Sequence, residues 1–487
     1  MSLAISDSAL LKTQAYINGN WVSSNSQESI AVTNPATGEV LAQVEKMGAT
    51  ETKEAIEAAG VAMRNWQRQS AKTRANILRS WFDLVMAHQE DLAIIMTAEQ
   101  GKTLAESRGE VAYGASYIEW FAEQAKRIDG DVIPAPGPDK RIVCIKQPVG
   151  VCAAITPWNF PNAMITRKAA PALAAGCTIV IKPASETPLS ALALAELAHR
   201  AGIPAGVLNV VVGASSAIGE ELTRNPLVRK LTFTGSTPVG KMLEEQCAKT
   251  LKKTSMELGG NAPFIVFEDA DLDAAVQGAM ISKYRNSGQT CVCSNRLLVH
   301  EAVAEEFTAR LAKATAALKL GNGADEGTQM GPLVNRKAVE DVDSLVQSTV
   351  AAGAKVVMGG KPSALGPCFY EPTILTGVTA DMAVFRNEIS GPVAPVVTFT
   401  SEDEAIAIAN DTEFGLASYF YTRDIGRVWR VSEALEYGIV GVNEGIISNE
   451  MAPFGGVKES GSGREGSKYG IEDYLEIKYI LMGGLDR

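Results

Sequence analysis

The chain has 487 residues and a formal net charge of −11, from 45 Lys and Arg against 56 Asp and Glu. This acidic balance argues against a protein that binds nucleic acid or an anionic membrane, because such a surface would be basic. Aromatic residues are only 6% of the chain and glycines number 44, which favours α/β layers over an aromatic-rich β-sandwich. The length predicts two or three domains.

The cysteines and histidines indicate the setting of the protein. Seven scattered cysteines without a CxxC pair favour a reducing, cytoplasmic compartment. The N-terminal residues lack the pattern of a signal peptide, and the longest apolar stretch, 169–181, is broken by Pro171, Gly176 and Thr178, so we expect no membrane span. The three histidines have no Cys or acid at ligand spacing, so we expect no metal site.

The region before about residue 125 is predicted to be largely helical. After Thr50, a suitable N-cap, the apolar residues Ile56, Ala59, Met63 and Trp66 recur at three- and four-residue spacing, as on an amphipathic helix. Residues 128–148 then carry four prolines and short β-branched runs. This change predicts a hairpin or arm that stands away from the core.

From residue 149 onward, short apolar runs alternate with helical patterns. Strands are predicted at 151–155, 178–181, 207–212 and 230–234, and helices near 163–175, 188–201, 216–223 and 238–248. This rhythm is typical of a parallel sheet with covered faces, where ligands bind beyond the carboxyl ends of the strands.

A second α/β set is predicted past residue 258. Its strands are expected at 263–267, 297–300, 355–358, 395–400, 418–422 and 439–443, and a last strand within 466–484 is expected to pair with the arm or with another subunit. We therefore predict one domain from 1–127 and 149–258, a second from 259–465, and an arm from 128–148 and 466–487.

Two motifs contain candidate catalytic residues. Cys291, in GQTCVC, follows a helical pattern and precedes a strand, but a thiol is nucleophilic only as thiolate, and an isolated cysteine is more often core filling. Glu257, in ELGGN, lies between apolar neighbours that would raise the pKa of its carboxyl, as suits a general base. A turn acid exposed to solvent is the simpler interpretation of Glu257.

Polar and glycine residues follow several of the predicted strands. The segment from Gly235 to Lys241 matches the first seven positions of a P-loop but has Met242 where a magnesium ligand is needed, leaving a helix start that could bind phosphate. Asn159 could donate to an oxyanion, and Lys182 could contact a ribose or phosphate oxygen, although each could also be a turn residue.

Seven motifs in one order, PWNFP, KPASETP, FTGS, ELGGN, GQTC, NEISGP and PFGGVK, resemble the aldehyde dehydrogenase superfamily over nearly the whole chain. Further segments, including GQTCVCSNR and GIISNE, resemble its succinate-semialdehyde dehydrogenase branch. The resemblance implies a Rossmann-like cofactor domain, a catalytic α/β domain and an oligomerisation arm that makes a homodimer or homotetramer.

The resemblance also implies a role for each matching residue. Cys291 attacks the aldehyde, Glu257 activates water to hydrolyse the thioester, and Asn159 with the backbone N–H of Cys291 holds the oxyanion. The implied cofactor contacts are Thr156, Pro157, Trp158, Lys182, Pro183, Ala184, Ser185, Gly235, Ser236, Leu258 and Glu388.

The branch implies oxidation of succinate semialdehyde in GABA degradation, with glutarate semialdehyde or another ω-carboxy aldehyde as the alternative. The implied contacts of the substrate carboxylate are Arg167, Arg285 and Ser448. We expect NADP to be favoured over NAD, because Ser185 stands where an acid would repel a 2′-phosphate, although Glu186 lies next to it.

Two further residues, Cys293 and Ser390, lie close in the sequence to implied site residues. Cys293 is interpreted as a packed residue or as a redox partner of Cys291. Ser390 replaces an aromatic residue usual in relatives, which would loosen packing around the nicotinamide. A phosphate-transferring enzyme is disfavoured by Met242, and a non-catalytic relative by the presence of both Cys291 and Glu257.

Overall fold

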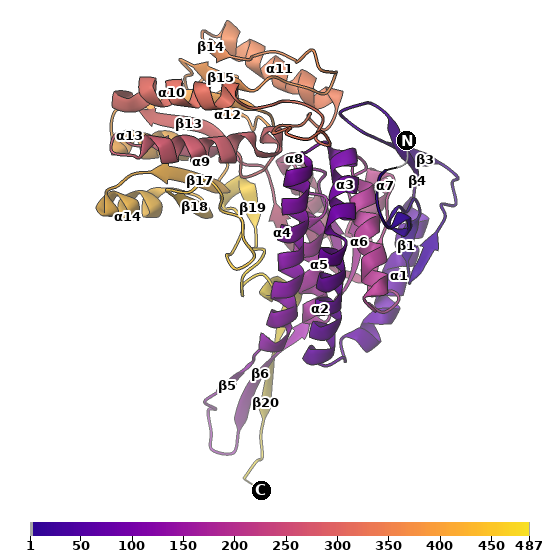
Figure 1. Cartoon of the computed structure of the whole chain (residues 1–487). Coiled ribbons are helices and arrows are strands. Elements are labelled where there is room, and N and C mark those ends of the chain that lie inside the picture. Colours follow the sequence, from indigo (N-terminus) through magenta and orange to yellow (C-terminus); the bar gives the residue numbers. More distant parts are fainter. Residues whose placement is uncertain (1–2, 487) are drawn as a thin grey trace.

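The first of two large sheets has eight strands, five of them parallel, in the computed structural model, which describes residues 3–486 (Figure 1). Its order is β19 (Gly461–Ser462), β11 (Lys253–Glu257), β10 (Val228–Thr234), β7 (Val151–Ile155), β8 (Thr178–Lys182), β9 (Leu208–Val210), β1 (Ala15–Ile17) and β2 (Asn20–Val22). The strands β11 to β9 in this order are parallel, and the outer three strands pair antiparallel. The chain order reverses between β7 and β10, so the ends of these two strands form a topological switch point.

Helices cover both faces of this sheet. One face packs against α1 (Ala49–Trp66), α7 (Ser215–Arg224) and α8 (Thr237–Ala248). The other packs against α2 (Ala71–Ala87), α3 (Gln89–Gln100), α4 (Leu104–Gln124), α5 (Ala163–Ala175) and α6 (Pro188–Arg200). The apolar stripe predicted from residue 56 is buried on α1, and the buried runs of β7 and β8 explain why these strands were recognisable in the sequence.

The second sheet has seven strands, all parallel except the edge strand β14. Its order is β14 (Lys355–Met358), β15 (Thr373–Thr376), β16 (Val393–Phe399), β13 (Ser294–His300), β12 (Ala262–Val266), β17 (Ala417–Tyr421) and β18 (Ile439–Val442). Around it lie α9 (Leu272–Tyr284), α10 (Glu301–Ala316), α11 (Arg336–Ala351), α12 (Ala383–Arg386), α13 (Glu402–Asn410) and α14 (Ile425–Ala434). The α/β class predicted for both halves of the chain is confirmed.

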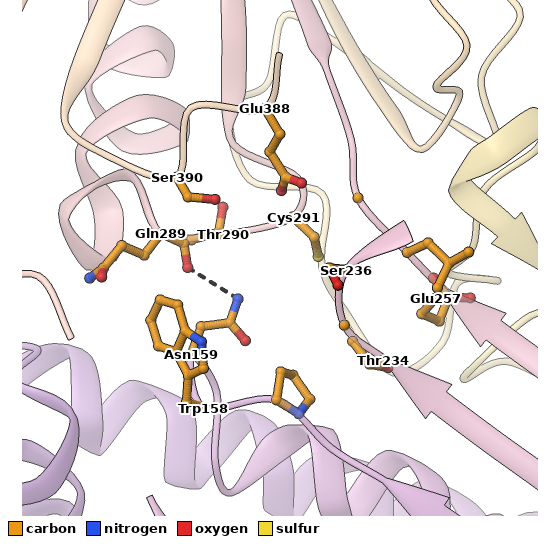
Figure 2. A pocket seen from close by; sticks show the side chains of 14 residues that line it. Trp158, Asn159, Thr234, Ser236, Glu257, Gln289, Thr290, Cys291, Glu388 and Ser390 are labelled. Carbon is orange, nitrogen blue, oxygen red and sulfur yellow. Dashed lines mark hydrogen bonds between the residues drawn. The ribbon is translucent and has the colours of Figure 1, made fainter. Parts of the chain in front are cut away.

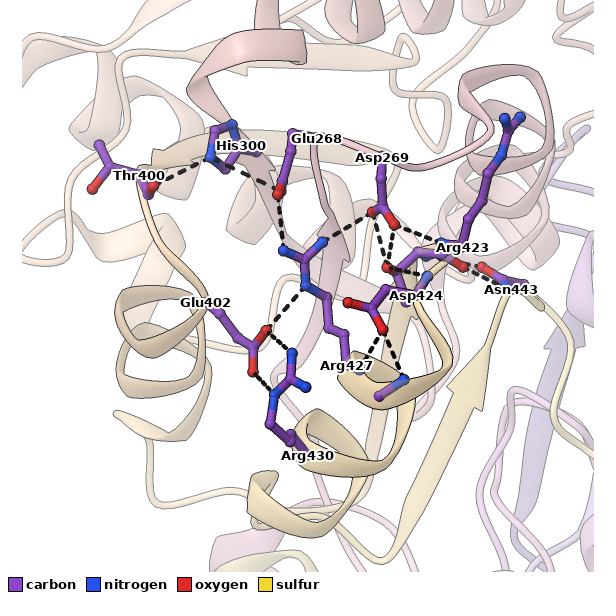
Figure 3. Close-up of polar contacts among 12 residues, drawn as sticks. Glu268, Asp269, His300, Thr400, Glu402, Arg423, Asp424, Arg427, Arg430 and Asn443 are labelled. Carbon is purple, nitrogen blue, oxygen red and sulfur yellow. Dashed lines mark hydrogen bonds and ion pairs between the residues drawn. The ribbon is translucent and has the colours of Figure 1, made fainter.

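A network of ion pairs closes the carboxyl edge of the second sheet (Figure 3). Arg427 of α14 donates to Glu268 at 2.8 Å, to Asp269 at 3.0 Å and to Glu402 at 3.0 Å. Glu268 and Asp269 follow β12, so the network ties α13 and α14 to the end of a central strand. In this sheet, the edge that usually binds ligands is occupied by the protein's own side chains.

An arm of three antiparallel strands projects from the part of the molecule that is built around the first sheet (Figure 1). It consists of β20 (Leu475–Met482), β6 (Arg141–Pro148) and β5 (Asp131–Ile133), with β6 in the centre. The prediction that a last strand pairs with the arm is confirmed within the chain itself. No helix between residues 3 and 486 has the length and apolarity needed to cross a membrane.

The prediction that the region before about residue 125 is largely helical was wrong in part. Residues 15–45 contain four strands, including β3 (Ser29–Thr33) and β4 (Val40–Glu45), which are mostly exposed or half-buried and therefore show no buried apolar run. The two-residue strand β19 joins the first sheet although it lies in the segment assigned to the second domain. Tyr474 packs in the core of the first sheet, and the arm strand β20 starts at Leu475, within the predicted segment 466–484. Five short 3-10 turns complete the fold: Ser8–Leu10, Ala125–Arg127, Arg285–Gly288, Lys458–Ser460 and Glu472–Tyr474.

Candidate active site

A cavity of about 170 Å³ lies between the two sheets (Figure 2). Residues that follow β7, β10 and β11 line it from the first sheet, and residues that precede β12, β13 and β16 line it from the second. The cavity therefore joins the carboxyl edge of one parallel sheet to the amino edge of the other. Its lining is Pro157, Trp158, Asn159, Thr234, Gly235, Ser236, Glu257, Leu258, Gly259, Gln289, Thr290, Cys291, Glu388 and Ser390.

Cys291 reaches the cavity from a loop that requires unusual backbone angles. Asn286, Ser287 and Gly288 have φ values of 50°, 57° and 77°, and a Cβ on Gly288 would lie 2.1 Å from the carbonyl oxygen of Gly391. Only glycine fits at position 288. Burial raises the pKa of the Cys291 thiol to about 12, and the nearby positive charge of Arg167 opposes this rise. The thiol needs a base or a bound ligand to ionise at neutral pH.

Glu257 ends β11 and is buried, with only 3% of its surface exposed. Its Oε2 atom has no hydrogen-bond partner in the described part of the chain. Burial raises the pKa of Glu257 well above its usual range, and the negative charge of Glu465 raises it further. A carboxylate in this state accepts a proton readily, so Glu257 fits a general base better than a turn acid exposed to solvent.

Arg167 lies in a different environment from the one expected for a substrate contact. Its side chain is 1% exposed, and its Nε donates to Glu465, which also accepts from Lys168. Its guanidinium packs over the Phe454 ring at 4.2 Å. Arg167 lines neither this cavity nor the cavity described below, and Nη2 is its one buried nitrogen without a partner among residues 3–486.

Asn159 faces Cys291 across the cavity (Figure 2). Its Nδ2 donates to the carbonyl oxygen of Gln289 at 3.1 Å, two residues before the thiol. An amide nitrogen has two hydrogens, so one remains for an oxyanion on a carbon that bonds to the Cys291 sulfur. Asn159 therefore has the chemistry and the place of an oxyanion donor.

Six of the predicted cofactor residues line the cavity: Pro157, Trp158, Gly235, Ser236, Leu258 and Glu388. The other five lie at or just after the ends of β7 and β8 but outside the lining of the cavity: Thr156, Lys182, Pro183, Ala184 and Ser185. Lys182 is nearly buried, and its Nζ donates to the carbonyl of Pro183 at 3.2 Å. The predicted cofactor residues thus form two groups, one that lines the cavity and one that lies further along the edge of the sheet.

The cavity residues fit a dinucleotide with a pyrophosphate. Ser236 is the N-cap of α8, yet its hydroxyl accepts no backbone N–H of that helix and remains available to a ligand. The first turn of a helix offers further unpaired N–H groups to a phosphate. Opposite it, the Glu388 carboxyl has a pKa raised to about 7 by burial, and Gly259 has no side chain that would collide with it. Glu388 can accept hydrogen bonds from ribose hydroxyls.

A second cavity of about 280 Å³ adjoins the first, because Phe160 lines it and the preceding residue, Asn159, lines the first. Arg285 and Ser448 both line this second cavity. Arg285 forms no ion pair among residues 3–486, and its guanidinium lies 5.5 Å from the centre of the Phe160 ring. A free guanidinium beside a hydroxyl suits a carboxylate.

Several residues at the two cavities were not anticipated from the sequence. Gln289, Thr290 and Thr234 line the first cavity, and Lys102, Glu106 and Glu110 line the second. The two glutamates are four residues apart in a segment with the pattern of an ordinary amphipathic helix, so the sequence does not distinguish the buried Glu110 or the partly exposed Glu106.

Ser390 and Cys293 lie in different surroundings, one exposed and one buried. Ser390 is exposed and lines the first cavity. Its backbone has a φ of 50°, a conformation that residues other than glycine seldom adopt. Cys291 and Cys293 are both free thiols, and Cys293 is buried with its Sγ donating to the carbonyl of Lys283 at 3.4 Å.

Comparison with known proteins identifies the class of this fold and site. The model of the aldehyde dehydrogenase family matches residues 21–480. The chain belongs to the aldehyde dehydrogenase family and is an oxidoreductase of the type that uses NAD(P).

Relatives that are similar over nearly the whole chain are named for three different aldehydes: glutarate semialdehyde, 3-sulfolactaldehyde and succinate semialdehyde. Glutarate-semialdehyde dehydrogenase of Pseudomonas aeruginosa is 62% identical, over 99% of this chain and 100% of its own. The NADP(+) succinate-semialdehyde dehydrogenase of Escherichia coli is also 62% identical, over 99% and 100%. The crystal structure of succinate-semialdehyde dehydrogenase from Burkholderia pseudomallei superposes with a TM-score of 0.98 at 61% identity, over 99% of this chain and 100% of that one.

The raised pKa of Cys291 predicts how its reactivity changes with pH. Because the thiolate fraction rises as pH approaches a pKa of about 12, alkylation by iodoacetamide without cofactor should accelerate about tenfold per pH unit between about pH 7 and pH 9. The measurement is the rate constant of inactivation, with Cys291→Ser as the control for labelling of other thiols. A plateau near neutral pH would contradict the raised pKa.

Proposed function

We propose that this enzyme oxidises succinate semialdehyde to succinate with NADP+, through a thiohemiacetal and a thioester on Cys291. The observation that carries the proposal is the meeting of Cys291, Glu257 and Asn159 in one cavity, next to a second cavity with the free Arg285. Glutarate semialdehyde is the alternative substrate, since one methylene is worth only about 1–3 kcal/mol of discrimination.

In the first step the thiolate sulfur of Cys291 bonds to the aldehyde carbon, and the π bond of the carbonyl breaks. The carbonyl oxygen becomes an oxyanion, and its two proposed donors are the free hydrogen of the Asn159 amide and the backbone N–H of Cys291. Removing such a donor typically costs about 100- to 1000-fold in rate. The chemistry that a bound NADP+ supplies is acceptance of hydride from the carbon attached to sulfur.

The second step breaks the thioester. Glu257 takes a proton from water, the water oxygen attacks the acyl carbon, and the Cys291 thiolate leaves. The unpaired Oε2 and the raised pKa of Glu257 support this role, because a carboxylate paired with Arg167 or Lys168 would be a weaker base.

The distal carboxylate of the substrate is assigned to Arg285 and Ser448. Arg285 has no anionic partner among residues 3–486, whereas Arg167 already pairs with Glu465. We therefore give Arg167 a structural and electrostatic role near the thiol and leave the direct contact with substrate to Arg285.

Replacing Arg285 by Ala should separate charged from neutral aldehydes. Loss of a charge-assisted hydrogen bond predicts that KM for succinate semialdehyde rises roughly 10- to 100-fold, while KM for propanal changes little. The matched variant Arg167→Ala should lower Tm and impair both aldehydes alike, because it leaves Glu465 underpaired. The test is NADPH formation with each aldehyde, and equal losses in Arg285→Ala would contradict its role.

The preference for NADP+ is proposed from charge near the ribose. Ser185 can donate to a 2′-phosphate and Lys182 can complement its charge, while Glu186 is exposed beside them. Ser185→Glu should lower kcat/KM for NADP+ by roughly 10- to 100-fold and spare NAD+. Ser185→Ala, which adds no charge, should lose much less. A parent enzyme that prefers NAD+ would contradict the assignment.

We propose that the arm joins copies of the chain into a dimer or tetramer. We also propose that the enzyme is cytoplasmic and acts in GABA degradation. Ile477 and Tyr479 on β20 are 71% and 60% exposed, an unusual exposure for apolar side chains on a projecting sheet.

Charges placed on this arm should weaken the assembly. Ile477→Asp with Tyr479→Asp should reduce the mass measured by light scattering, because a carboxylate is costly to bury in an apolar contact. Val61→Asp, at an exposed position on α1, should leave the mass unchanged. An unchanged mass in the arm variant would contradict the proposal.

A further inference from the structure

The two loops that carry Asn159 and Cys291 are held together by buried groups from α4 and the residues before it. The carbonyl oxygen of Asn159 accepts two hydrogen bonds, from Lys102 Nζ at 2.7 Å and from Asn286 Nδ2 at 3.0 Å. None of these donors has been given a role in the reaction described above.

Lys102 is a charged side chain with almost no access to solvent. It is 1% exposed, its Nζ lies 2.5 Å from Glu110 Oε2, and it stands 4.0 Å from the centre of the Phe160 ring. Burial lowers the pKa of Lys102, and the charge of Glu110 opposes that change. A buried ammonium that donates to a carboxylate and a carbonyl is fixed in place, so it is poorly suited to binding substrate itself.

Glu110 completes the support from the other side. Its Oε1 accepts from the backbone N–H groups of Asn162 and Ala163 at 2.9 and 3.2 Å, which are the N-cap and first residue of α5. The pair thus grips the loop of Asn159 at two points, the carbonyl of Asn159 and the helix start three residues later.

Residues of the same segment also contact the loop that contains Cys291. Asn286 receives a hydrogen bond on its Oδ1 from Gln100 at 3.0 Å, and its backbone N–H donates to Glu106 at 2.8 Å. Asn286 has a left-handed φ of 50°, so these contacts stabilise a conformation that is otherwise disfavoured. Through Asn286, the segment from Gln100 to Glu110 touches both loops.

We propose that Lys102 and Glu110 are positioning residues, which hold the Asn159 amide at the distance from Cys291 that the oxyanion requires. The proposal rests on the proposed roles of Cys291 and Asn159. Its physical basis is that a donor displaced by about 1 Å can lose on the order of 100-fold in rate, even when the change is remote from the reacting atoms.

The test separates positioning from stability by using two variants. Lys102→Met leaves Glu110 buried without its cation and should lower both Tm and kcat. The double variant Lys102→Met with Glu110→Gln removes both charges, so Tm should recover, but kcat should stay lowered by up to about 100-fold because the Asn159 carbonyl keeps only its hydrogen bond from Asn286. If kcat recovers together with Tm, the pair is only structural and the proposal fails.

A double-mutant cycle shows whether the effect passes through Asn159. In an Asn159→Ala background, Lys102→Met should reduce kcat by no more than about twofold, since the group it positions is already absent. Full additivity of the two losses would overturn the proposal. Lys252→Met is the matched control: Lys252 is also buried and donates to two backbone carbonyls, of Asn225 and Val228, but contacts neither loop. It should lower Tm and leave kcat unchanged.

Hydrolysis of p-nitrophenyl acetate, followed by release of nitrophenolate, makes the test independent of the proposed substrate. Acyl transfer to Cys291 forms the same kind of oxyanion, without a semialdehyde or a cofactor. A parent enzyme that hydrolyses this ester but does not oxidise succinate semialdehyde would refute the proposed substrate only. Unchanged ester hydrolysis in the double variant would refute the positioning role.

Discussion

The properties of the site depend on which of two buried carboxylates, Glu257 or Glu465, pairs with the neighbouring cations. Two buried carboxylates, Glu257 and Glu465, lie near the same two cations, Arg167 and Lys168, and both cations bond to Glu465. Glu257 is therefore left unpaired in a medium that disfavours its ionised form, which makes it a strong proton acceptor. If Arg167 and Lys168 bonded to Glu257 and not to Glu465, the same residues would be present, but Glu257 would lose its strength as a proton acceptor.

The relative placement of the two sheets explains why one cavity contains both the proposed base, Glu257, and the proposed nucleophile, Cys291. The first sheet contributes loops from its carboxyl edge, at the switch point between β7 and β10, as expected for a parallel sheet. The second contributes its amino edge, and its carboxyl edge is closed by the ion pairs of Arg427. The cavity thus forms where the sheets meet and belongs to neither sheet alone.

The sequence predicted the features that are local or carried by motifs. Buried apolar runs such as β7 and β8 were found, whereas β1 to β4 and β19 were not, because β1 has only three residues and the other four strands are partly exposed. The cavity residues Cys291, Glu257 and Asn159 came from motifs. The partner of Arg167 could not be predicted, since Glu465 is 298 residues away and only the fold brings it near. The same holds for Lys102, whose carbonyl acceptor is 57 residues distant.

The most direct test of Glu257 as the hydrolytic base is to trap the acyl enzyme. A Glu257→Gln variant mixed with succinate semialdehyde and NADP+ should release a single burst of NADPH and then stop. Peptide mass spectrometry of the acid-quenched protein should find a succinyl group on Cys291. Steady turnover at the parent rate, or an acyl group on any cysteine other than Cys291, would contradict the roles given to these two residues.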